Sequence, residues 1–424
     1  MNALNWEPYT PAEVRDGVPA AQQMLDRCDQ LAQLSSLASG ICRVYLSDEH
    51  KRANALTAEW LAEAGCEVWE DAVGNICGRY RAAVPDAPTL MLGSHLDSIP
   101  DAGAYDGILG VLLGIAAVAA LNERRERLPF NIDVVGFGEE EGVRFGTTLM
   151  TSRACAGTWE DAWWSLKDSD GVSLREAFER FGLDPARVRD ATRDDLLGFF
   201  EVHIEQGPVL ESLGLPLGTV TGIAGNRRLR ARIDGQAGHA GTTPMPLRRD
   251  AGVAAALAVA ELERIALSDD VMATVGQLEF EPGGVNVIPG GAAFTLDIRS
   301  ADDGRRDTAL ARFRTFADAL CAERGLRFSL EEFHQAPAMH CNERLMVACD
   351  AALAALNHPP QRLPSGAGHD AMAMAEVCPA GMLFLRCTAG ISHHPDEAVT
   401  LTDVAWSLAA LKRVLNHLAS EPRS

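Results

Sequence analysis

"TLMLGSHLDSIPDAGAYDGILGVLLGIAAVAALNERRE", residues 89–126, joins a short apolar run to a long apolar segment through a loop rich in polar side chains. The run at 89–93 predicts a buried strand, and residues 107–126 have the periodicity of a mostly buried helix that ends in charge. The loop between them contains His95, Asp97, Asp101 and Asp106. Aspartate and glycine also favour turns, so a loop of turn residues is the plain alternative to a functional site.

Three further apolar runs predict strands of the same kind, at 131–138, 199–206 and 381–386. Each of the four runs stands next to a histidine or a cluster of glutamates. The runs alternate with segments of helical periodicity, such as 19–39 and 48–66, which indicates a largely buried α/β sheet. Open α/β sheets place their sites at strand ends, so we expect the polar clusters to meet at one edge.

The pattern changes between residues 216 and 338. Segments such as "LRARIDG" and "AAFTLDIRS" alternate apolar and polar residues around helical stretches near 250–266 and 305–324. This alternation predicts a sheet that two helices cover on one face. In "FTLDIR", the apolar side chains of Phe294, Leu296 and Ile298 share that face.

The length of 424 residues suits two or three domains rather than one. We therefore predict an α/β domain in two parts, residues 1–215 and 339–424, interrupted by an inserted α+β domain at 216–338.

Charge and composition exclude several classes of function. The chain has 38 Lys and Arg against 59 Asp and Glu, a net charge of -21 spread along its length, which disfavours nucleic-acid or anionic-membrane surfaces. It has no stretch of 18 uninterrupted apolar residues and no secretory signal at its start, so we expect a cytoplasmic protein. The ten cysteines form no C-x-x-C pair and indicate buried thiols.

Histidine and carboxylate residues gather in four clusters at the predicted strand ends. The clusters are His95 with Asp97 and Asp106, "GEEEGVRFG" (138–146), "HIEQG" (203–207) and "SHHPDE" (392–397). Zinc binds imidazole nitrogen and carboxylate oxygen, and one carboxylate can bridge two metal ions about 3.5 to 4 Å apart. Each cluster alone is weak evidence, and their shared position is what points to a metal centre.

The sequence resembles the di-metal aminoacylase and carboxypeptidase superfamily over nearly its whole length. The matching motifs, in order, are "GSHLDSIPDAGAYDG", "EEEGVRF", "HIEQGPVLE", "GQAGHAGTTPM", "VNVIPG", "DIRS", "SGAGHDA" and "ISHHPDE". They resemble the carbamoyl-amidohydrolase branch, which includes allantoate amidohydrolases, N-carbamoyl-L-amino-acid hydrolases and β-ureidopropionases. The resemblance implies an exopeptidase-like α/β catalytic domain with an inserted α+β lid and dimerisation domain, and a homodimer.

The same resemblance implies two divalent metal ions per subunit. His95 and His203 would be terminal ligands of one ion, Glu141 and His393 of the other, and Asp106 would bridge them. The ligand types suit zinc, manganese, cobalt or nickel.

The catalytic roles also come from the resemblance. Glu140 would be the general base, with Glu139 as the competitor if the register of "EEEG" slips by one residue. Asp97 would orient the His95 imidazole. His239 would stabilise the oxyanion in the active site of a partner subunit. A turn histidine among small residues is the plain alternative for His239.

For substrate binding, the matching motifs imply Gln206, Asn286, Arg299 and Gly366. The guanidinium of Arg299 would hold a substrate carboxylate, although a strand arginine paired with Asp297 or Asp302 is the plain alternative. Which subunit supplies Asn286 and Arg299 is open.

The expected activity is hydrolysis of a terminal ureido group, with allantoate converted to ureidoglycine, ammonia and CO2. The alternative substrates are N-carbamoyl-L-amino acids or N-carbamoyl-β-alanine. A third interpretation is a binding protein without turnover, against which the intact pair Glu140 and Glu141 argues.

Overall fold

The computed structural model describes residues 10–421, and the chain divides into two compact units. Unit 1 extends to Thr221 and also holds Cys341–Leu363 and the chain from Ala367, whereas unit 2 holds Gly222–His340 and Pro364–Gly366. The insertion thus begins at Gly222 rather than at the expected residue 216, because the first part of strand β6 (Leu217–Ile223) pairs with β16 (Ala380–Leu385) in unit 1.

Unit 1 is built on a mixed sheet with strands in the order β1-β2-β4-β3-β5-β16-β6, and β15 pairs with β6. Its other strands are β1 (Glu67–Glu70), β2 (Ile76–Tyr80), β3 (Thr89–His95), β4 (Asn131–Phe137), β5 (Leu196–Ile204) and β15 (Arg362–Ser365). The four central strands, β4, β3, β5 and β16, run parallel. They are the four apolar runs that predict buried strands, and the expected α/β class is confirmed.

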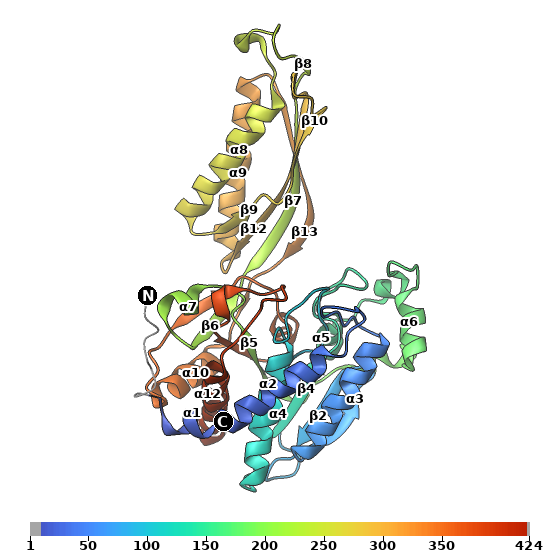
Figure 1. The fold of residues 1–424 in the computed structure, drawn as a ribbon, viewed down its shortest axis with the longest axis vertical. Coiled ribbons are helices and arrows are strands. Elements are labelled where there is room, and N and C mark those ends of the chain that lie inside the picture. The colour runs from blue at the N-terminus through green and yellow to red at the C-terminus, as the bar shows by residue number, and fades with distance from the viewer. Residues whose placement is uncertain (1–9, 422–424) are drawn as a thin grey trace. The chain divides into compact units, whose positions relative to one another are not determined.

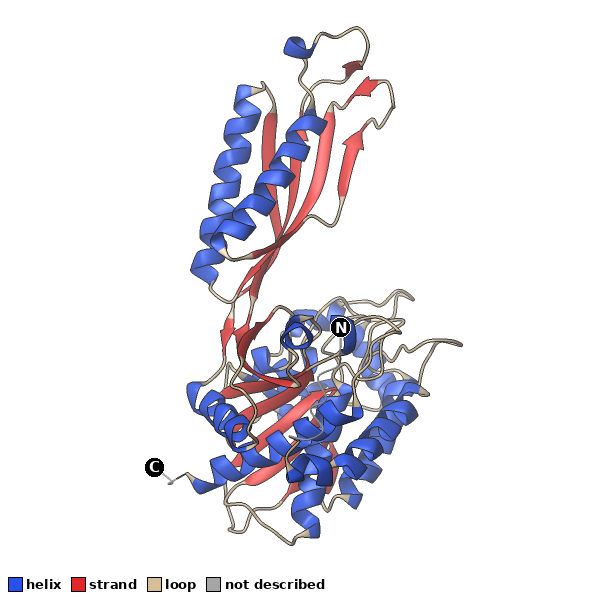
Figure 2. Ribbon diagram, turned by 60° about the vertical axis from the view of Figure 1, so that its left-hand side comes forward, coloured by secondary structure: helices blue, strands red, loops and turns tan. Residues whose placement is uncertain are grey.

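Helices cover both faces of this sheet (Figure 2). The longest are α2 (Val18–Ala32), α3 (Asp48–Glu63), α4 (Ile108–Glu123), α10 (Glu343–Ala355) and α12 (Leu401–Ser420). Shorter helices are α1 (Ala12–Asp16), α5 (Met150–Cys155), α6 (Leu174–Phe181), α7 (Val209–Leu213) and α11 (Ala371–Met374). Helix α4 lies very close to β5, because a Cβ added at Gly110 would be 2.2 Å from the carbonyl oxygen of Val202.

The predicted helix at 19–39 is too long, since α2 ends at Ala32. The hydroxyl of Ser35 accepts hydrogen bonds from the backbone N–H groups of Leu37 and Cys42 and donates one to the carbonyl of Gly40. Such local side-chain bonds offer the backbone an alternative to the helix.

Unit 2 is an antiparallel sheet with two helices on one face (Figures 1 and 2). Its strand order is β10-β12-β7-β13, with β9 beside β12, and a separate two-stranded sheet joins β8 to β11. Its elements are β7 (Gly225–Asp234), β8 (Gly238–His239), α8 (Ala251–Asp269), β9 (Met272–Thr274), β10 (Leu278–Glu281), β11 (Val287–Ile288), β12 (Gly291–Ser300), α9 (Asp303–Glu323), β13 (Arg327–Ala336) and β14 (Met339–His340). Phe294, Leu296 and Ile298 are buried in the core beneath the helices, as the alternation predicts.

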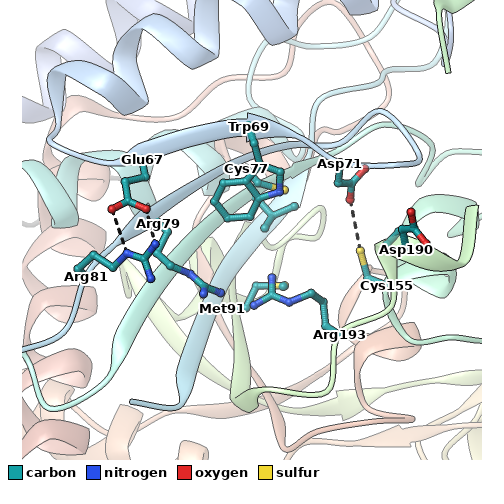
Figure 3. A pocket seen from close by; sticks show the side chains of 12 residues that line it. Glu67, Trp69, Asp71, Cys77, Arg79, Arg81, Met91, Cys155, Asp190 and Arg193 are labelled. Atoms are coloured by element: carbon teal, nitrogen blue, oxygen red, sulfur yellow. Dashed lines mark hydrogen bonds and ion pairs between the residues drawn. The ribbon is translucent and has the colours of Figure 1, made fainter. Parts of the chain in front are cut away.

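A cavity of about 220 Å³ in unit 1 is lined by three arginines, Arg79, Arg81 and Arg193 (Figure 3). Arg79 donates two hydrogen bonds of 2.7 Å to the fully buried carboxylate of Asp133, and Arg193 lies 2.8 Å from the same carboxylate. Arg81 pairs with Glu67. The three arginines that line the cavity therefore already have carboxylate partners.

All ten cysteines are free, and nine of them are buried. Among residues 10–421, none of the helices is both long and apolar enough to cross a membrane.

Candidate metal centre

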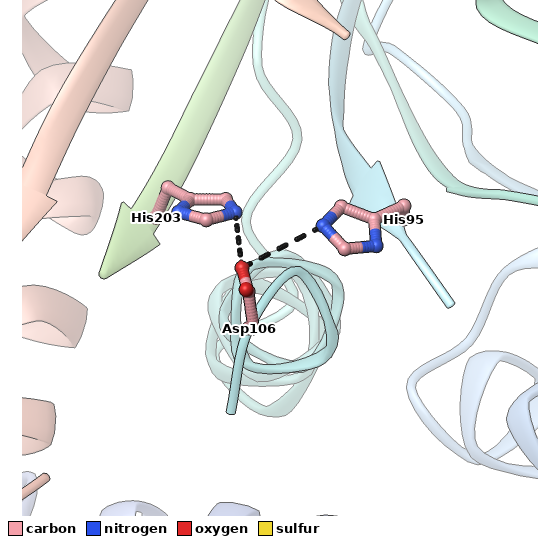
Figure 4. Close-up of side chains that lie close together, drawn as sticks. All are labelled: His95, Asp106 and His203. Carbon is pink, nitrogen blue, oxygen red and sulfur yellow. Dashed lines mark ion pairs between the residues drawn. The ribbon is translucent and has the colours of Figure 1, made fainter. Parts of the chain in front are cut away.

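The carboxyl ends of the parallel strands bring the predicted ligands together. His95 is the last residue of β3, His203 lies near the end of β5, and Asp106 precedes helix α4 (Figure 4). Gly107 lies between Asp106 and the helix with φ of 74°, and a Cβ there would be 2.3 Å from Nε2 of His95. Only glycine fits this position without moving the imidazole.

Asp106 presents its two carboxylate oxygens to two different groups of side chains. Oδ1 is 3.1 Å from Nε2 of His203 and 3.8 Å from Nε2 of His95. Oδ2 is 3.2 Å from Nε2 of His393, which lies 3.5 Å from Oε1 of Glu141. The five predicted ligands therefore form two groups, each able to hold one ion, with Asp106 in both.

The hydrogen bonding of the imidazoles tests whether these residues suit a metal ion. Nδ1 of His203 lies 2.8 Å from the carbonyl oxygen of Ile204, and Nδ1 of His95 lies 3.0 Å from that of Asp97. A carbonyl only accepts, so in the neutral imidazoles Nδ1 carries the proton and Nε2 offers a lone pair. With His203 neutral, its Nε2 and Oδ1 of Asp106 are two buried acceptors that face each other 3.1 Å apart, and neither has a donor as partner. Two facing acceptors repel unless a cation lies between them, so the donor set fits divalent metal.

Without a cation, these groups share protons. Burial lowers the pKa of His203, but the hydrogen bond and charge of Asp106 outweigh burial and raise it. Burial would raise the pKa of Asp106, yet hydrogen bonds from the three imidazoles hold it well below its usual value. Burial raises the pKa of Glu141 to about 7 and that of Glu140 well above its ordinary value. A divalent ion must therefore displace protons when it binds.

The backbone of the "EEEG" turn is held by Asp97. Its Oδ1 and Oδ2 accept hydrogen bonds of 3.1 Å from the backbone N–H groups of Glu140 and Glu141. Oδ1 is also 3.5 Å from Nδ1 of His95, so Asp97 contacts the imidazole it is predicted to orient as well as the turn. Glu140 and Glu141 group with His95, whereas Glu139 belongs to none of the candidate metal groups in the described chain.

Gln206, a predicted substrate contact, lies among the ligands. Its Nε2 donates a 2.9 Å hydrogen bond to Oδ2 of Asp106, and its Oε1 is buried without a partner. Gln206 and His393 both have positive φ, 56° and 55°, a conformation that costs energy for residues other than glycine and that clusters at functional sites.

The other predicted residues lie in unit 2. His239 pairs with Val287 across β8 and β11, and the carbonyl of Asn286 accepts the N–H of Ala240. Arg299 donates to both carboxylate oxygens of Asp297, at 2.8 and 2.9 Å, and to the carbonyl of Gly366. The alternative pairing of Arg299 with Asp297 is therefore present. Gly366 contacts the Arg299 guanidinium through its carbonyl oxygen.

Sequence reasoning missed Glu397, which supports the centre, and Glu201, which groups with His203 and His369 as candidate metal ligands. Glu397 is buried, and its Oε1 accepts the N–H groups of Tyr105 and Asp106 at 2.9 and 3.1 Å. Its Oε2 is 3.0 Å from the hydroxyl of Ser392. Glu201, two residues before His203 on β5, is fully buried. The sequence feature that could have identified Glu397 as part of the site is its position at the end of the cluster "SHHPDE".

Comparison with known proteins gives concordant matches. The model of peptidase family M20/M25/M40 matches residues 91–417. The chain is 40% identical to an N-carbamoyl-L-amino acid amidohydrolase of Geobacillus stearothermophilus, covering 94% of this chain and 98% of the relative. It is 38% identical to a probable allantoate deiminase of Oryza sativa subsp. japonica, covering 90% of this chain and 85% of the relative. Among solved structures, a hydantoinase/carbamoylase family amidase from Burkholderia multivorans is similar, with a TM-score of 0.89, 34% identity, and 95% and 98% of the two chains covered.

Proposed function

Because this chain belongs to the M20/M25/M40 peptidase family, whose members are metal-dependent hydrolases, we propose that it hydrolyses the terminal ureido group of a carboxylate-bearing substrate. The observation that carries the proposal is the position of Asp106, with one oxygen toward His203 and the other toward His393. The relatives named as amidohydrolases and deiminases of ureido compounds support the choice of bond.

In the proposed reaction, R–NH–CO–NH2 and one water give R–NH2, CO2 and NH3. Two divalent ions, held by the ligands above, would polarise the ureido carbonyl and lower the pKa of water. Glu140 takes a proton from the attacking water and returns it to the departing nitrogen. Oε1 of Gln206, which lacks a partner, accepts an N–H from the ureido group.

Allantoate is the first candidate substrate and N-carbamoyl-L-amino acids are the second. Relatives with both names cover nine-tenths or more of this chain at similar identity, so their names support the class of ureido acids rather than one member. Both candidates combine a carboxylate with a ureido carbonyl, and Asn286 and Arg299 are the proposed contacts to the part of the substrate away from the metals.

We further propose that the active unit is a homodimer in which the partner subunit's His239 completes each site. Arg299 lies eight residues beyond Gly291 along β12, which places it about 27 Å from that end at about 3.4 Å per residue. Gly291 pairs with Asp234, and the chain continues from there to His239 in β8. A ureido acid is no longer than about three extended residues, roughly 10 Å, and this difference in length supports the proposal that His239 acts in the site of the partner subunit.

The test is ammonia release from allantoate, N-carbamoyl-L-amino acids and N-carbamoyl-β-alanine by metal-loaded protein, with a dipeptide and an N-acetyl amino acid as controls. The Glu140→Gln variant is the matched inactive control. Turnover of ureido acids alone is the expected result, and turnover confined to the dipeptide or the N-acetyl amino acid would contradict the proposal.

The dimer has its own test. Inactive His239→Ala and inactive Glu140→Gln chains, mixed under conditions that exchange subunits, should regain activity. In the mixed dimer, one site combines an intact Glu140 with an intact His239. A verified mixed dimer without activity would show that His239 does not act across subunits.

A further inference from the structure

Unit 1 contains a second cavity, of about 360 Å³, which none of the predicted metal ligands lines. Its walls come from the chain after α7 (214–216), the turn after α10 (357–359), Arg386 directly after β16, and the start of α12 (402–406). These elements lie together at one side of unit 1 (Figure 1). Because every lining residue belongs to unit 1, the cavity is complete within one compact unit. Its volume lies in the range of about 300 to 1,000 Å³ in which proteins bind small organic molecules.

The lining of this cavity includes a buried histidine with an unused nitrogen. His358 is 4% exposed, and its Nδ1 lies 2.6 Å from the carbonyl oxygen of Pro359. In the neutral imidazole, Nδ1 therefore carries the proton and Nε2 offers a lone pair. Nε2 is buried and has no hydrogen-bond partner among residues 10–421. Leaving a buried acceptor without a donor is unfavourable, so Nε2 is suited to accept an N–H group of a bound molecule.

The charged side chains of the cavity cancel each other. Arg386 donates hydrogen bonds of 2.9 to 3.0 Å from Nε and Nη2 to the buried carboxylate of Asp403. Nη1 of Arg386 makes no hydrogen bond within residues 10–421 and stays available as a donor. Burial lowers the pKa of His358 below its ordinary value, so this side chain adds no charge at pH 7. The cavity therefore favours a neutral molecule over an ion.

An aromatic ring and apolar side chains make up much of the remaining wall. Trp406 is 6% exposed, and its ring meets that of His358 edge to face, with the ring centroids 5.6 Å apart. Leu215, Pro216 and Pro359 add apolar surface. Aromatic rings pack favourably against an indole in stacked or edge-to-face arrangements. The lining thus fits a molecule that combines an aromatic ring with one donor and one acceptor.

We propose that this cavity binds a neutral aromatic amide, whose N–H donates to Nε2 of His358 and whose carbonyl oxygen accepts from Nη1 of Arg386. The amide is flat and has its donor and its acceptor on separate atoms, as the two side chains require. This binding site is separate from the proposed function, because its lining contains no predicted metal ligand, no proposed base and no proposed substrate contact. Binding should therefore not need a metal ion.

The first experiment compares two neutral probes of nearly the same shape, N-methylbenzamide and methyl benzoate, in which an oxygen replaces the N–H. Dissociation constants are measured by NMR titration of the metal-loaded and of the metal-free protein. N-methylbenzamide should bind with a Kd of about 0.1 to 1 mM, as expected for a molecule of this size. Methyl benzoate should bind about 3- to 10-fold more weakly, the range for one lost hydrogen bond. Equal affinity for the two probes, no binding of the amide, or binding that needs metal would overturn the proposal.

The second experiment uses His358→Phe, which keeps an aromatic ring against Trp406 and removes Nε2. The preference for the amide over the ester should disappear in this variant. His417→Phe makes the same substitution on α12 outside the cavity, and it should keep the preference of the wild type. Thermal unfolding verifies that both variants are folded, and the comparison of the two probes in the wild type decides the question if one is not. A folded His358→Phe protein that still prefers the amide would show that the N–H does not reach His358, and the proposal would be wrong.

Discussion

Replacing Asp97 with asparagine isolates the contact that holds the "EEEG" turn. The Asp97 side chain is 2% exposed, and each of its oxygens accepts one backbone N–H, from Glu140 and from Glu141. Asparagine keeps one acceptor and places an NH2 donor where the other N–H points. One hydrogen bond is lost, and one buried N–H is left facing a donor.

The expected cost follows from these two contacts. A hydrogen bond to a charged group contributes about 1.5 to 3 kcal/mol, and a buried donor left without a partner costs about 1 to 3 kcal/mol. The backbone of Glu141, a predicted ligand, moves with the turn. We therefore expect the metal-free protein to lose about 2.5 to 6 kcal/mol of unfolding free energy. Metal affinity should fall by about 10- to 100-fold, the usual effect of removing a residue that supports a ligand.

The assay is chelator competition for metal affinity and urea unfolding for stability, with Asp101→Asn as the control. Asp101 lies on the same loop, is exposed, and has φ of 56°, which asparagine adopts readily. The control should match the wild type in both measurements. If Asp97→Asn bound metal as tightly as Asp101→Asn, the turn would not depend on the carboxylate and our account of Asp97 would be wrong.

Four further predictions concern the metal centre and the sheet beneath it. Glu140→Gln should keep both ions by elemental analysis and lose several orders of magnitude in kcat, whereas Glu141→Gln should lose metal; the reverse would shift the assignment by one residue. Exhaustive chelation should abolish turnover without unfolding, by circular dichroism, because the ligands stand on a sheet with its own large core. Metal affinity, measured by titration between pH 6 and 8, should rise with pH. The pKa of Glu141 is about 7 without a cation, so below that pH a proton competes with the metal ion for its carboxylate. A metal affinity that does not change with pH would contradict this prediction. Arg79→Ala should cost about 2 to 3 kcal/mol in urea unfolding, through the buried Asp133, while Arg81→Ala, whose partner Glu67 is exposed, should cost under about 1 kcal/mol; equal losses would contradict the assignment.

The sequence predicts the architecture well where one physical rule dominates. Strands buried on both faces must be continuous apolar runs, and β3, β4, β5 and β16 are recognisable for that reason. The predicted ligands lie at the ends of those strands or in the loops that follow them, so their meeting at one edge could be expected from parallel pairing alone.

Other features depend on contacts between residues distant in the chain, which no local pattern encodes. The end of α2 is decided by the hydroxyl of Ser35, and the start of the insertion by the pairing of β6 with β16. Glu397 reaches the N–H of Asp106 from 291 positions away.

The length of β12 has a consequence for how the protein must be handled. In the homodimer proposed above, with Arg299 near one end of β12 and the chain to His239 leaving the other, a turnover-competent site would be formed by a pair of molecules rather than by one. Specific activity should then depend on protein concentration. Dilution below the dissociation constant of the dimer would leave chains that are folded and fully loaded with metal but inactive. A rate measured only at nanomolar protein would then underestimate the specific activity of the dimer.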